Sequence, residues 1–227
     1  SIIIPCYNEE ETVGEVIRRV LAVSFPGWTT EVIVVNDGST DNTASVLDQF
    51  SSDVKAVHLA RNSGKGSAVR AGLMAAGGDF AIIQDADLEC MPEEIPALLA
   101  PLRDFVPETK IAVMGSRELG GKTPNRVLLS RLGALSITKL INTLYGSSLT
   151  DVLMGYKLFP KAAFGYFNAG GFGSEVLFIA RLLKEGYRIV EVPVSYHPRK
   201  WNAGKKMKYR QGFKTIMRLL AFQMTRH

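Results

Sequence analysis

Three acidic residues alternate in the segment Asp85-Ala-Asp87-Leu-Glu89, close after the apolar run AII. In an extended chain, residues two positions apart share a face, so the three carboxylates would repel each other unless a cation lay among them. Oxygen ligands favour the hard cations Mg²⁺ and Mn²⁺, which keep waters and substrate phosphates as further ligands. The spacing therefore predicts a magnesium or manganese site. The alternative is a helix start, where the helix dipole favours acidic side chains.

Polar segments also follow the other predicted strands of the first half. PCYNEE, NDGSTDNT, RNSGKGS and QDADLE come at the ends of apolar, β-branched runs at Ser1–Ile4, Glu31–Val35, Val54–Leu59 and Phe80–Gln84. Helical patterns separate these runs, near Glu9–Val23, Asp41–Phe50, Gly66–Ala76 and Pro92–Leu102. The alternation predicts an α/β fold with a doubly wound, mostly parallel, Rossmann-like sheet. Ligands of such sheets bind beyond the carboxyl ends of the strands, so we expect the four polar segments to form one site.

The second half is less regular. A further strand is predicted at Ile111–Met114, an extended stretch at Val152–Phe159 and a strand at Arg188–Val194. Helices are predicted over 126–145, 174–185 and 209–225, the last with apolar residues at helical spacing and basic residues between them. We therefore expect the fold to end in a basic amphipathic helix.

Composition and charge exclude several classes of protein. Hydrophobic residues make up 46% and charged residues 22% of the 227, which excludes wholesale disorder. The sequence has no run of about 18 apolar residues, the length that a membrane span requires. Its two cysteines cannot form a disulfide scaffold. No His or Cys pair has the spacing of a zinc site. Because the chain starts inside an apolar run at Ser1, we expect that it has been trimmed there.

The charge is unevenly distributed. Residues 181–227 hold 12 Lys and Arg but 2 Asp and Glu, a balance of +10, whereas the other 180 residues hold 15 basic and 20 acidic residues, a balance of −5. A positive end on a mildly acidic body predicts a polyanionic partner, such as phosphates or a membrane surface. Few aromatic residues interleave the basic run, so we expect no nucleic acid partner.

Taken together, the motifs PCYNEE, VNDGSTDNT, RNSGKGSAVRAG and DADLE resemble family 2 of the glycosyltransferases, and most of all its dolichyl- and polyprenyl-phosphate sugar synthases. The resemblance continues through GSR at 115–117, DVLMGYKLF at 151–159 and EVPVSYHPR with GKK at 191–206. It implies a GT-A fold, a nucleotide-diphosphate sugar donor such as GDP-mannose or a UDP-hexose, and Mg²⁺ or Mn²⁺ as cofactor.

The resemblance also implies roles for residues of the donor site. The nucleotide-sugar ligands would be Pro5, Tyr7, Glu9, Asp37, Lys65 and Asp85. Asp85 and Asp87 would hold the metal, and Asp87 would be catalytic through it. Glu89 stands where such synthases often carry Gln, and it can still offer an oxygen to the metal. A metal there would neutralise the diphosphate as it leaves the sugar.

The acceptor implied by the resemblance is a lipid monophosphate, which is already ionised and needs cations around it. We expect Arg117, Arg131, Arg199 and Lys205 to bind this phosphate, with Arg117 also catalytic. An ionised phosphate can attack the anomeric carbon without a strong base, in one displacement that inverts the centre. Asp151 opens a family motif and would be catalytic, either orienting the sugar or acting as a base.

Three functions remain open from the sequence. The first is an inverting hexosyltransferase that acts on polyprenyl or dolichyl phosphate, cytoplasmic and peripheral at the membrane face. The second transfers sugar to a hydroxyl of a glycan or protein and needs Asp151 as its base. The third is a nucleotide-sugar-binding module without activity. For the two enzymes we expect a catalytic domain at 1–205, with a donor half at 1–115 and an acceptor half at 116–205, followed by the basic helix at 206–227.

Overall fold

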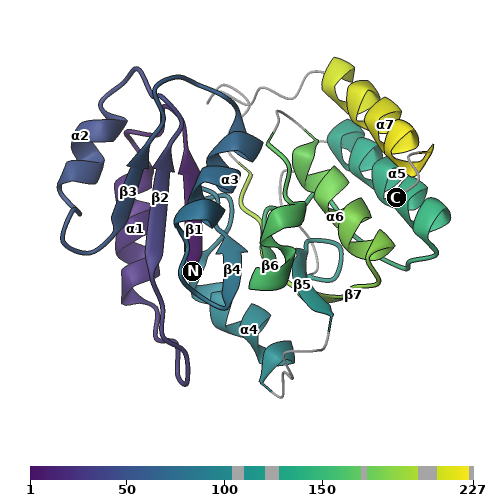
Figure 1. Cartoon of the computed structure of the whole chain (residues 1–227), viewed down its shortest axis with the longest axis horizontal. Helices are drawn as coiled ribbons and strands as arrows, with labels where there is room; N and C mark the ends of the chain where they lie inside the picture. The colour runs from purple at the N-terminus through teal and green to yellow at the C-terminus, as the bar shows by residue number, and fades with distance from the viewer. Residues whose placement is uncertain (104–109, 121–127, 170–172, 199–208, 225–227) are drawn as a thin grey trace.

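The computed structural model of the chain describes residues 1–103, 110–120, 128–169, 173–198 and 209–224. Within them lies a seven-stranded sheet, whose strands are β1 (Ile2–Cys6), β2 (Val32–Asn36), β3 (Lys55–His58), β4 (Phe80–Ile83), β5 (Ile111–Ser116), β6 (Lys157–Pro160) and β7 (Arg188–Pro193). The helices are α1 (Val13–Ala22), α2 (Thr43–Asp48), α3 (Lys65–Ala75), α4 (Ile95–Leu99), α5 (Leu128–Tyr145), α6 (Ser174–Lys184) and α7 (Tyr209–Met224). Figure 1 shows the sheet with helices on both sides.

The predicted fold class is confirmed, since the strands run in the order β3-β2-β1-β4-β6-β5-β7 and are mostly parallel. The exception is β6, which is antiparallel to both β4 and β5. This strand separates the two parallel groups and brings residues from the second half of the chain beside β4. The site at the end of β4 therefore receives side chains from both halves.

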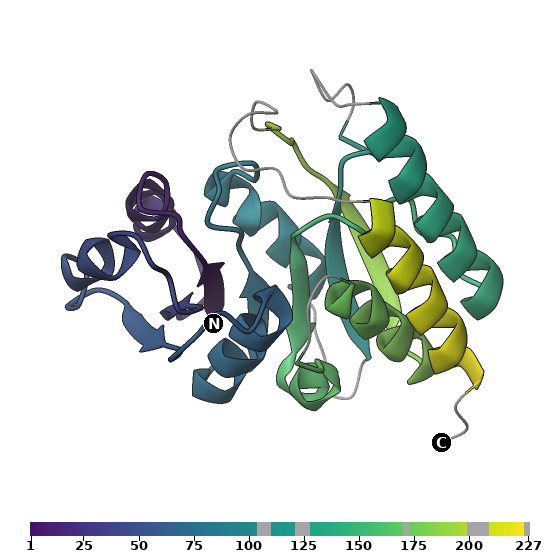
Figure 2. The ribbon, with the colours of Figure 1, turned by 90° about the horizontal axis from the view of Figure 1, so that it is seen from above.

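Two hydrophobic clusters cover the two faces of the sheet. Alternate residues of β1 and β2 enter different clusters, as expected for strands that are buried on both faces. One cluster contains buried residues of α3, α5, α6 and α7, and the other contains those of α1, α2 and α4. Figure 2 shows these helices as layers on either side of the strands. Val13, Val16, Ile17 and Val20 give α1 the one-sided spacing that lets it pack in this way.

Two predicted elements differ in the structure. The helix expected at Pro92–Leu102 is broken into a 3₁₀ turn, the short α4 and a second 3₁₀ turn, because Pro96 and Pro101 lack the N–H groups that a continuous helix would use. The extended stretch expected at Val152–Phe159 is a strand only from Lys157 onward, since the chain turns before it.

The predicted final helix is present as α7, and it packs on the protein. Thr215 and Leu219 are fully buried, and α7 lies beside α5 and α6 (Figures 1 and 2). A methyl group added at Gly173, just before α6, would lie 2.5 Å from the Thr215 hydroxyl, so the two helices meet closely. Met217, Leu220 and Met224 stay exposed on the other side of α7.

Candidate functional site

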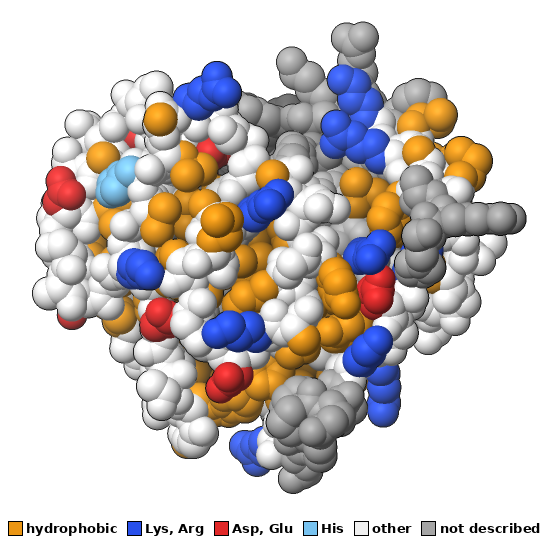
Figure 3. Space-filling model, in the orientation of Figure 1, with side chains coloured by type: hydrophobic (Ala, Val, Ile, Leu, Met, Phe, Trp, Pro, Cys, Tyr) orange, Lys and Arg blue, Asp and Glu red, His pale blue; other side chains and the backbone are white. Residues whose placement is uncertain are grey.

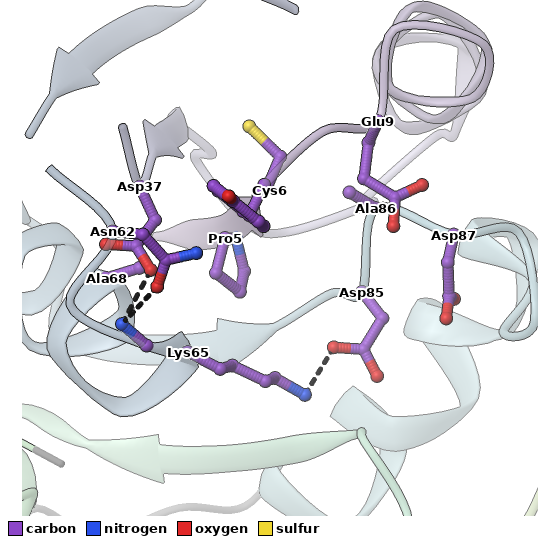
Figure 4. A pocket seen from close by; sticks show the side chains of 12 residues that line it. Pro5, Cys6, Glu9, Asp37, Asn62, Lys65, Ala68, Asp85, Ala86 and Asp87 are labelled. Carbon is purple, nitrogen blue, oxygen red and sulfur yellow. Dashed lines mark hydrogen bonds and ion pairs between the residues drawn. The ribbon is translucent and has the colours of Figure 1, made fainter. Parts of the chain in front are cut away.

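A pocket of about 290 Å³ opens at the carboxyl ends of β1, β2 and β4. It is lined by Pro5, Cys6, Tyr7, Glu9, Asp37, Asn62, Gly64, Lys65, Ala68, Asp85, Ala86 and Asp87. Figure 4 shows these side chains converging from the segments that follow the strands. The structure thus brings together all six residues predicted for the nucleotide sugar, as well as Asp87, and it does so at the edge where parallel sheets bind ligands.

The segments after β1 and β2 are joined by hydrogen bonds that fix one wall of the pocket. Asn8 adopts a positive φ of 54°, and its backbone N–H donates to the Ser39 hydroxyl at 3.0 Å. The Thr40 N–H donates to the Asn8 side chain at 2.8 Å, and the Glu9 N–H donates to the Thr43 hydroxyl at 3.0 Å. The polar residues of these two segments therefore form a scaffold for Tyr7 and Glu9.

Asp37 organises the segment that leads into α3. It is 2% exposed, and its two carboxylate oxygens accept the backbone N–H groups of Ser63 at 2.9 Å and Gly64 at 2.8 Å. A methyl group added at Gly38 would lie 2.4 Å from the backbone of Arg61, so only glycine fits there. Asp37 therefore positions the start of α3, where Lys65 is the first residue.

The expectation of an extended chain through Asp85, Asp87 and Glu89 is wrong. The segment turns after β4 ends at Ile83, and Leu88 has a positive φ of 58°. The turn is supported from below by Gln84, which is fully buried and donates to the backbone carbonyl of Asp85 at 3.0 Å. In this turn the Asp87 carboxylate accepts the backbone N–H of Glu89 at 3.1 Å.

The carboxylate of Glu89 points to a different partner. It accepts the hydroxyl of Tyr196, whose pKa is raised by burial and by this hydrogen bond. The backbone carbonyl of Glu89 accepts the N–H of His197 at 2.9 Å. Glu89 thus connects the turn after β4 to the segment after β7, and it does not line the pocket.

The geometry fits a divalent cation held by two carboxylates rather than three. No group of three or more His, Cys, Asp or Glu that could hold a metal occurs among the described residues, whereas Asp85 and Asp87 both line the pocket (Figure 4). Mg²⁺ and Mn²⁺ accept such a pair, because water and a substrate phosphate complete their coordination. The ammonium of Lys65 already lies 2.5 Å from Asp85, so this corner accommodates a positive charge.

Lys65 is part of a larger group of alternating charges. Its Nζ atom also lies 2.9 Å from Glu175, and Glu175 lies 3.5 Å from the Nζ atom of Lys157. Burial alone would lower the pKa of Lys65, but the carboxylates of Asp85 and Glu175 outweigh it and raise that pKa. Burial opposes ionisation of Glu175 too, but the two lysines lower its pKa. The opposite charges around Lys65 and Glu175 therefore favour the ionised form of each, whereas burial lowers the pKa of Lys157.

Asp151 and Arg117 form a buried ion pair. The guanidinium donates to the carboxylate at 2.6 and 2.7 Å, and the backbone N–H of Arg117 adds a bond of 3.2 Å. The side chains are 1% and 10% exposed. Burial would lower the pKa of Arg117, but Asp151 outweighs this and raises it. The guanidinium also lies 4.9 Å from the centre of the Tyr196 ring. Asp151 is thus held by Arg117 in this structure, and its catalytic role stays a prediction.

The other residues predicted to bind the acceptor phosphate do not line the pocket or are not described by the structure. Arg131 lies on α5, is half exposed, and pairs with Glu118 at 2.6 Å. Arg199 and Lys205 lie outside the described residues. Their roles remain predictions.

Four residues in or beside the site were not predicted from the sequence to be functional. The Tyr156 hydroxyl donates to the side-chain oxygen of Gln84 at 2.7 Å, next to the turn. Lys157 lies within β6. A methyl group added at Gly155 would lie 2.3 Å from a carboxylate oxygen of Asp85. All except Gln84 belong to the motif DVLMGYKLF, whose conspicuous Gly and Lys within an apolar stretch were the available signal.

The model of the glycosyl transferase family 2 domain matches residues 1–166. The chain therefore belongs to this family, as the resemblance of its motifs implied. Its fold is the GT-A fold of its structural neighbours. Glucosyl-3-phosphoglycerate synthase from Mycobacterium tuberculosis, solved with UDP, superposes with a TM-score of 0.76 at 22% identity, over 100% of this chain and 80% of that one. The same enzyme solved with Mn²⁺, UDP and phosphoglyceric acid gives a TM-score of 0.75 at 20% identity, over 100% and 78%.

Curated relatives carry names of lipid-phosphate sugar transferases. The undecaprenyl-phosphate 4-deoxy-4-formamido-L-arabinose transferase of Pectobacterium carotovorum is 38% identical over 158 residues, which cover 66% of this chain and 45% of the relative. The dolichyl-phosphate beta-glucosyltransferase of Trichomonas vaginalis is 30% identical over 217 residues, which cover 87% and 63%. The chain thus spans about half to two thirds of the lengths of these relatives.

Proposed function

We propose that this chain is the catalytic domain of an inverting glycosyltransferase that moves a hexose from a nucleotide-diphosphate sugar to a polyprenyl phosphate. The observation that carries the proposal is the pocket at the carboxyl edge of the sheet, which Asp85 and Asp87 both line and in which Asp85 pairs with Lys65. The names of the relatives, undecaprenyl-phosphate and dolichyl-phosphate sugar transferases, support the class of acceptor.

The pocket residues fit the binding of a donor. Pro5, Tyr7 and Glu9 would line the space for the nucleobase and ribose, and Asp37 would support them through the segment before α3. Lys65 would bind the diphosphate. Asp85 and Asp87 would hold Mg²⁺ or Mn²⁺, which supplies charge neutralisation for the leaving diphosphate when it is bound. Solved neighbours contain UDP with Mn²⁺ or Mg²⁺, which supports this choice of ligands.

The ion pair of Asp151 favours a phosphate acceptor over a hydroxyl. A hydroxyl needs a base that can reach it, and Asp151 is 1% exposed and held by two guanidinium bonds. A lipid phosphate carries its own negative charge and needs positioning and cations instead. Arg117, Arg131, Arg199 and Lys205 remain proposed ligands of the acceptor phosphate.

The surface of α7 supports a membrane-facing arrangement. Apolar Met217, Leu220 and Met224 are exposed next to exposed Lys214 and Arg218, and Figure 3 shows orange and blue side chains along the edge that α7 occupies. Such a mixture suits the boundary of an anionic bilayer. No helix in the described part of the chain has the length and apolar character that crossing a membrane requires.

The test is a transfer assay with Mn²⁺, radiolabelled nucleotide sugars and two acceptors, polyprenyl phosphate and a free sugar. We expect label in the lipid fraction, and a loss of at least about 10²-fold for Asp87→Asn. Asp48→Asn removes the same charge from the exposed end of α2 and serves as the matched control. Label only in the free sugar would refute the lipid acceptor, and label in neither would favour a binding module.

A further inference from the structure

Four charged side chains form an alternating series that starts in the pocket and ends in the core. Asp85 at the end of β4 pairs with Lys65 at the start of α3, and Lys65 pairs with Glu175 at the start of α6. Glu175 in turn lies 3.5 Å from Lys157 of β6. The series contains two positive and two negative groups, so it is neutral as a whole.

The two ends of the series differ in exposure. Lys157 is 1% exposed and its ammonium donates to the backbone carbonyl of Met154, which fixes the inner end. Lys65 is 39% exposed and Asp85 is 23% exposed, and both line the pocket. Figure 4 shows the Lys65 side chain reaching across the pocket floor to Asp85. Lys65 and Asp85 are therefore open to ligands and Lys157 is not, while Glu175, at 18% exposed, lies between the two ends.

The outer pair faces a conflict when a cation binds. One carboxylate oxygen of Asp85 is taken by Lys65, and the other lies against Gly155. A divalent cation bound to Asp85 would lie next to the ammonium of Lys65, and two adjacent positive charges repel strongly in a partly buried site. A lysine can answer by moving, because its charge sits on a flexible four-carbon stem.

We propose that Lys65 is the resident counter-ion of Asp85 and moves to the donor's diphosphate when a divalent cation replaces it. Glu175 and Lys157 are positioning residues for this exchange. Glu175 holds the ammonium near the pocket after it leaves Asp85, and Lys157 keeps Glu175 in place and ionised. The inference deepens the proposed function and rests on it, since it assigns the diphosphate as the second partner of Lys65.

The exchange is tested by binding of Mn²⁺ to the metal-free protein, followed by electron paramagnetic resonance, first alone and then with inorganic pyrophosphate. Lys65→Met removes the competing ammonium, so we expect this variant to bind Mn²⁺ alone at least about threefold more tightly. It should also lose the increase in Mn²⁺ affinity that pyrophosphate gives the unaltered protein. Lys139→Met removes the same charge from an exposed position of α5 and should change neither quantity.

Glu175→Gln leaves Lys65 with Asp85 as its sole partner in the series, so Mn²⁺ alone should bind at least about threefold more weakly. In the Lys65→Met background the same substitution should change the affinity by less than about twofold, because its effect runs through Lys65. A merely structural Glu175 would give equal effects in both backgrounds. Thermal unfolding checks that Glu175→Gln folds, and Lys65→Met carries the test by itself if it does not.

The inference is overturned if Mn²⁺ does not bind, if Lys65→Met leaves its affinity unchanged or weaker, or if Glu175→Gln acts equally in both backgrounds. The transfer assay separates this result from the proposed function. The expected binding pattern without label transfer to polyprenyl phosphate would retain the exchange and refute the acceptor. Transfer without the binding pattern would do the reverse.

Discussion

Replacing Asp151 by Ala should destabilise the protein strongly, because it leaves the Arg117 guanidinium buried without its counter-ion. The two side chains are 1% and 10% exposed, and two hydrogen bonds of 2.6 and 2.7 Å join them. Breaking a buried pair of this kind by removing one partner costs about 3–5 kcal/mol. That is a large part of the total stability of a domain, which is about 5–15 kcal/mol. The expected fall in melting temperature is about 6–20 °C, at about 2–4 °C for each kcal/mol.

The assay is urea unfolding followed by circular dichroism, with thermal unfolding in parallel. Glu15→Gln is the control, since it breaks the exposed pair with Arg18 and should cost less than about 0.5 kcal/mol. The double variant Arg117→Met with Asp151→Leu replaces both charges by apolar groups and should recover much of the loss, because the desolvation cost disappears as well.

The transfer assay gives the same variants a second reading. If Asp151 served as a base, Asp151→Asn would abolish transfer while the protein kept its stability. We expect the opposite order, with stability lost first and transfer lost in proportion to the unfolded fraction. A cost for Asp151→Ala no greater than that of Glu15→Gln, together with loss of turnover, would refute the structural role of this pair.

Three further predictions concern the pocket. Gly155→Ala places a methyl group 2.3 Å from an Asp85 carboxylate oxygen and should cut transfer by about 10²-fold. The control is Gly133→Ala, which lies in open space within α5 and should preserve transfer and stabilise the protein by about 0.5–1 kcal/mol. Equal transfer by the two variants would contradict this prediction. Burial, with nearby carboxylates, raises the pKa of Cys6 from 9.0 to about 12. Iodoacetamide at pH 8 should therefore label Cys6 only after unfolding, which mass spectrometry detects. The free energy of unfolding should fall as the pH rises above 9, where the thiol ionises in the unfolded protein but not in the folded one. Asp37→Asn removes the charge that accepts two backbone N–H groups and should cost about 1–3 kcal/mol in urea unfolding, and a smaller loss would show that the segment before α3 holds without it.

The sequence predicts most of the sheet and the pocket lining because both depend on short segments. Continuous β-branched runs favour buried strands, and parallel strands place the segments after them at one edge. Pro5, Asp37 and Asp85 could therefore be assigned to one site without knowledge of the strand order. The predicted elements for the first half consequently agree with the structure to within a few residues at most ends.

The geometry of the turn after β4 could not be derived in the same way. The alternation of Asp85, Asp87 and Glu89 predicts an extended chain, in which all three share a face. Instead the chain turns there, supported by a buried Gln84 that bonds to Tyr156, 72 residues further along the sequence. A local pattern gave the right residue types, but only two of the three carboxylates of this segment line the pocket.

The charge partners of the pocket residues depend on the one strand that breaks the parallel pattern. β6 runs antiparallel between β4 and β5 and pairs Lys157 with Ile83, two residues before Asp85. No periodicity within residues 1–115 indicates that a strand from the second half enters there. Because Lys157 fixes Glu175, and Glu175 binds Lys65, the electrostatics of the donor pocket follow from the insertion of this strand. The division into a donor half at 1–115 and an acceptor half at 116–205 stays a prediction, whereas the charged groups around the pocket come from both parts of the chain.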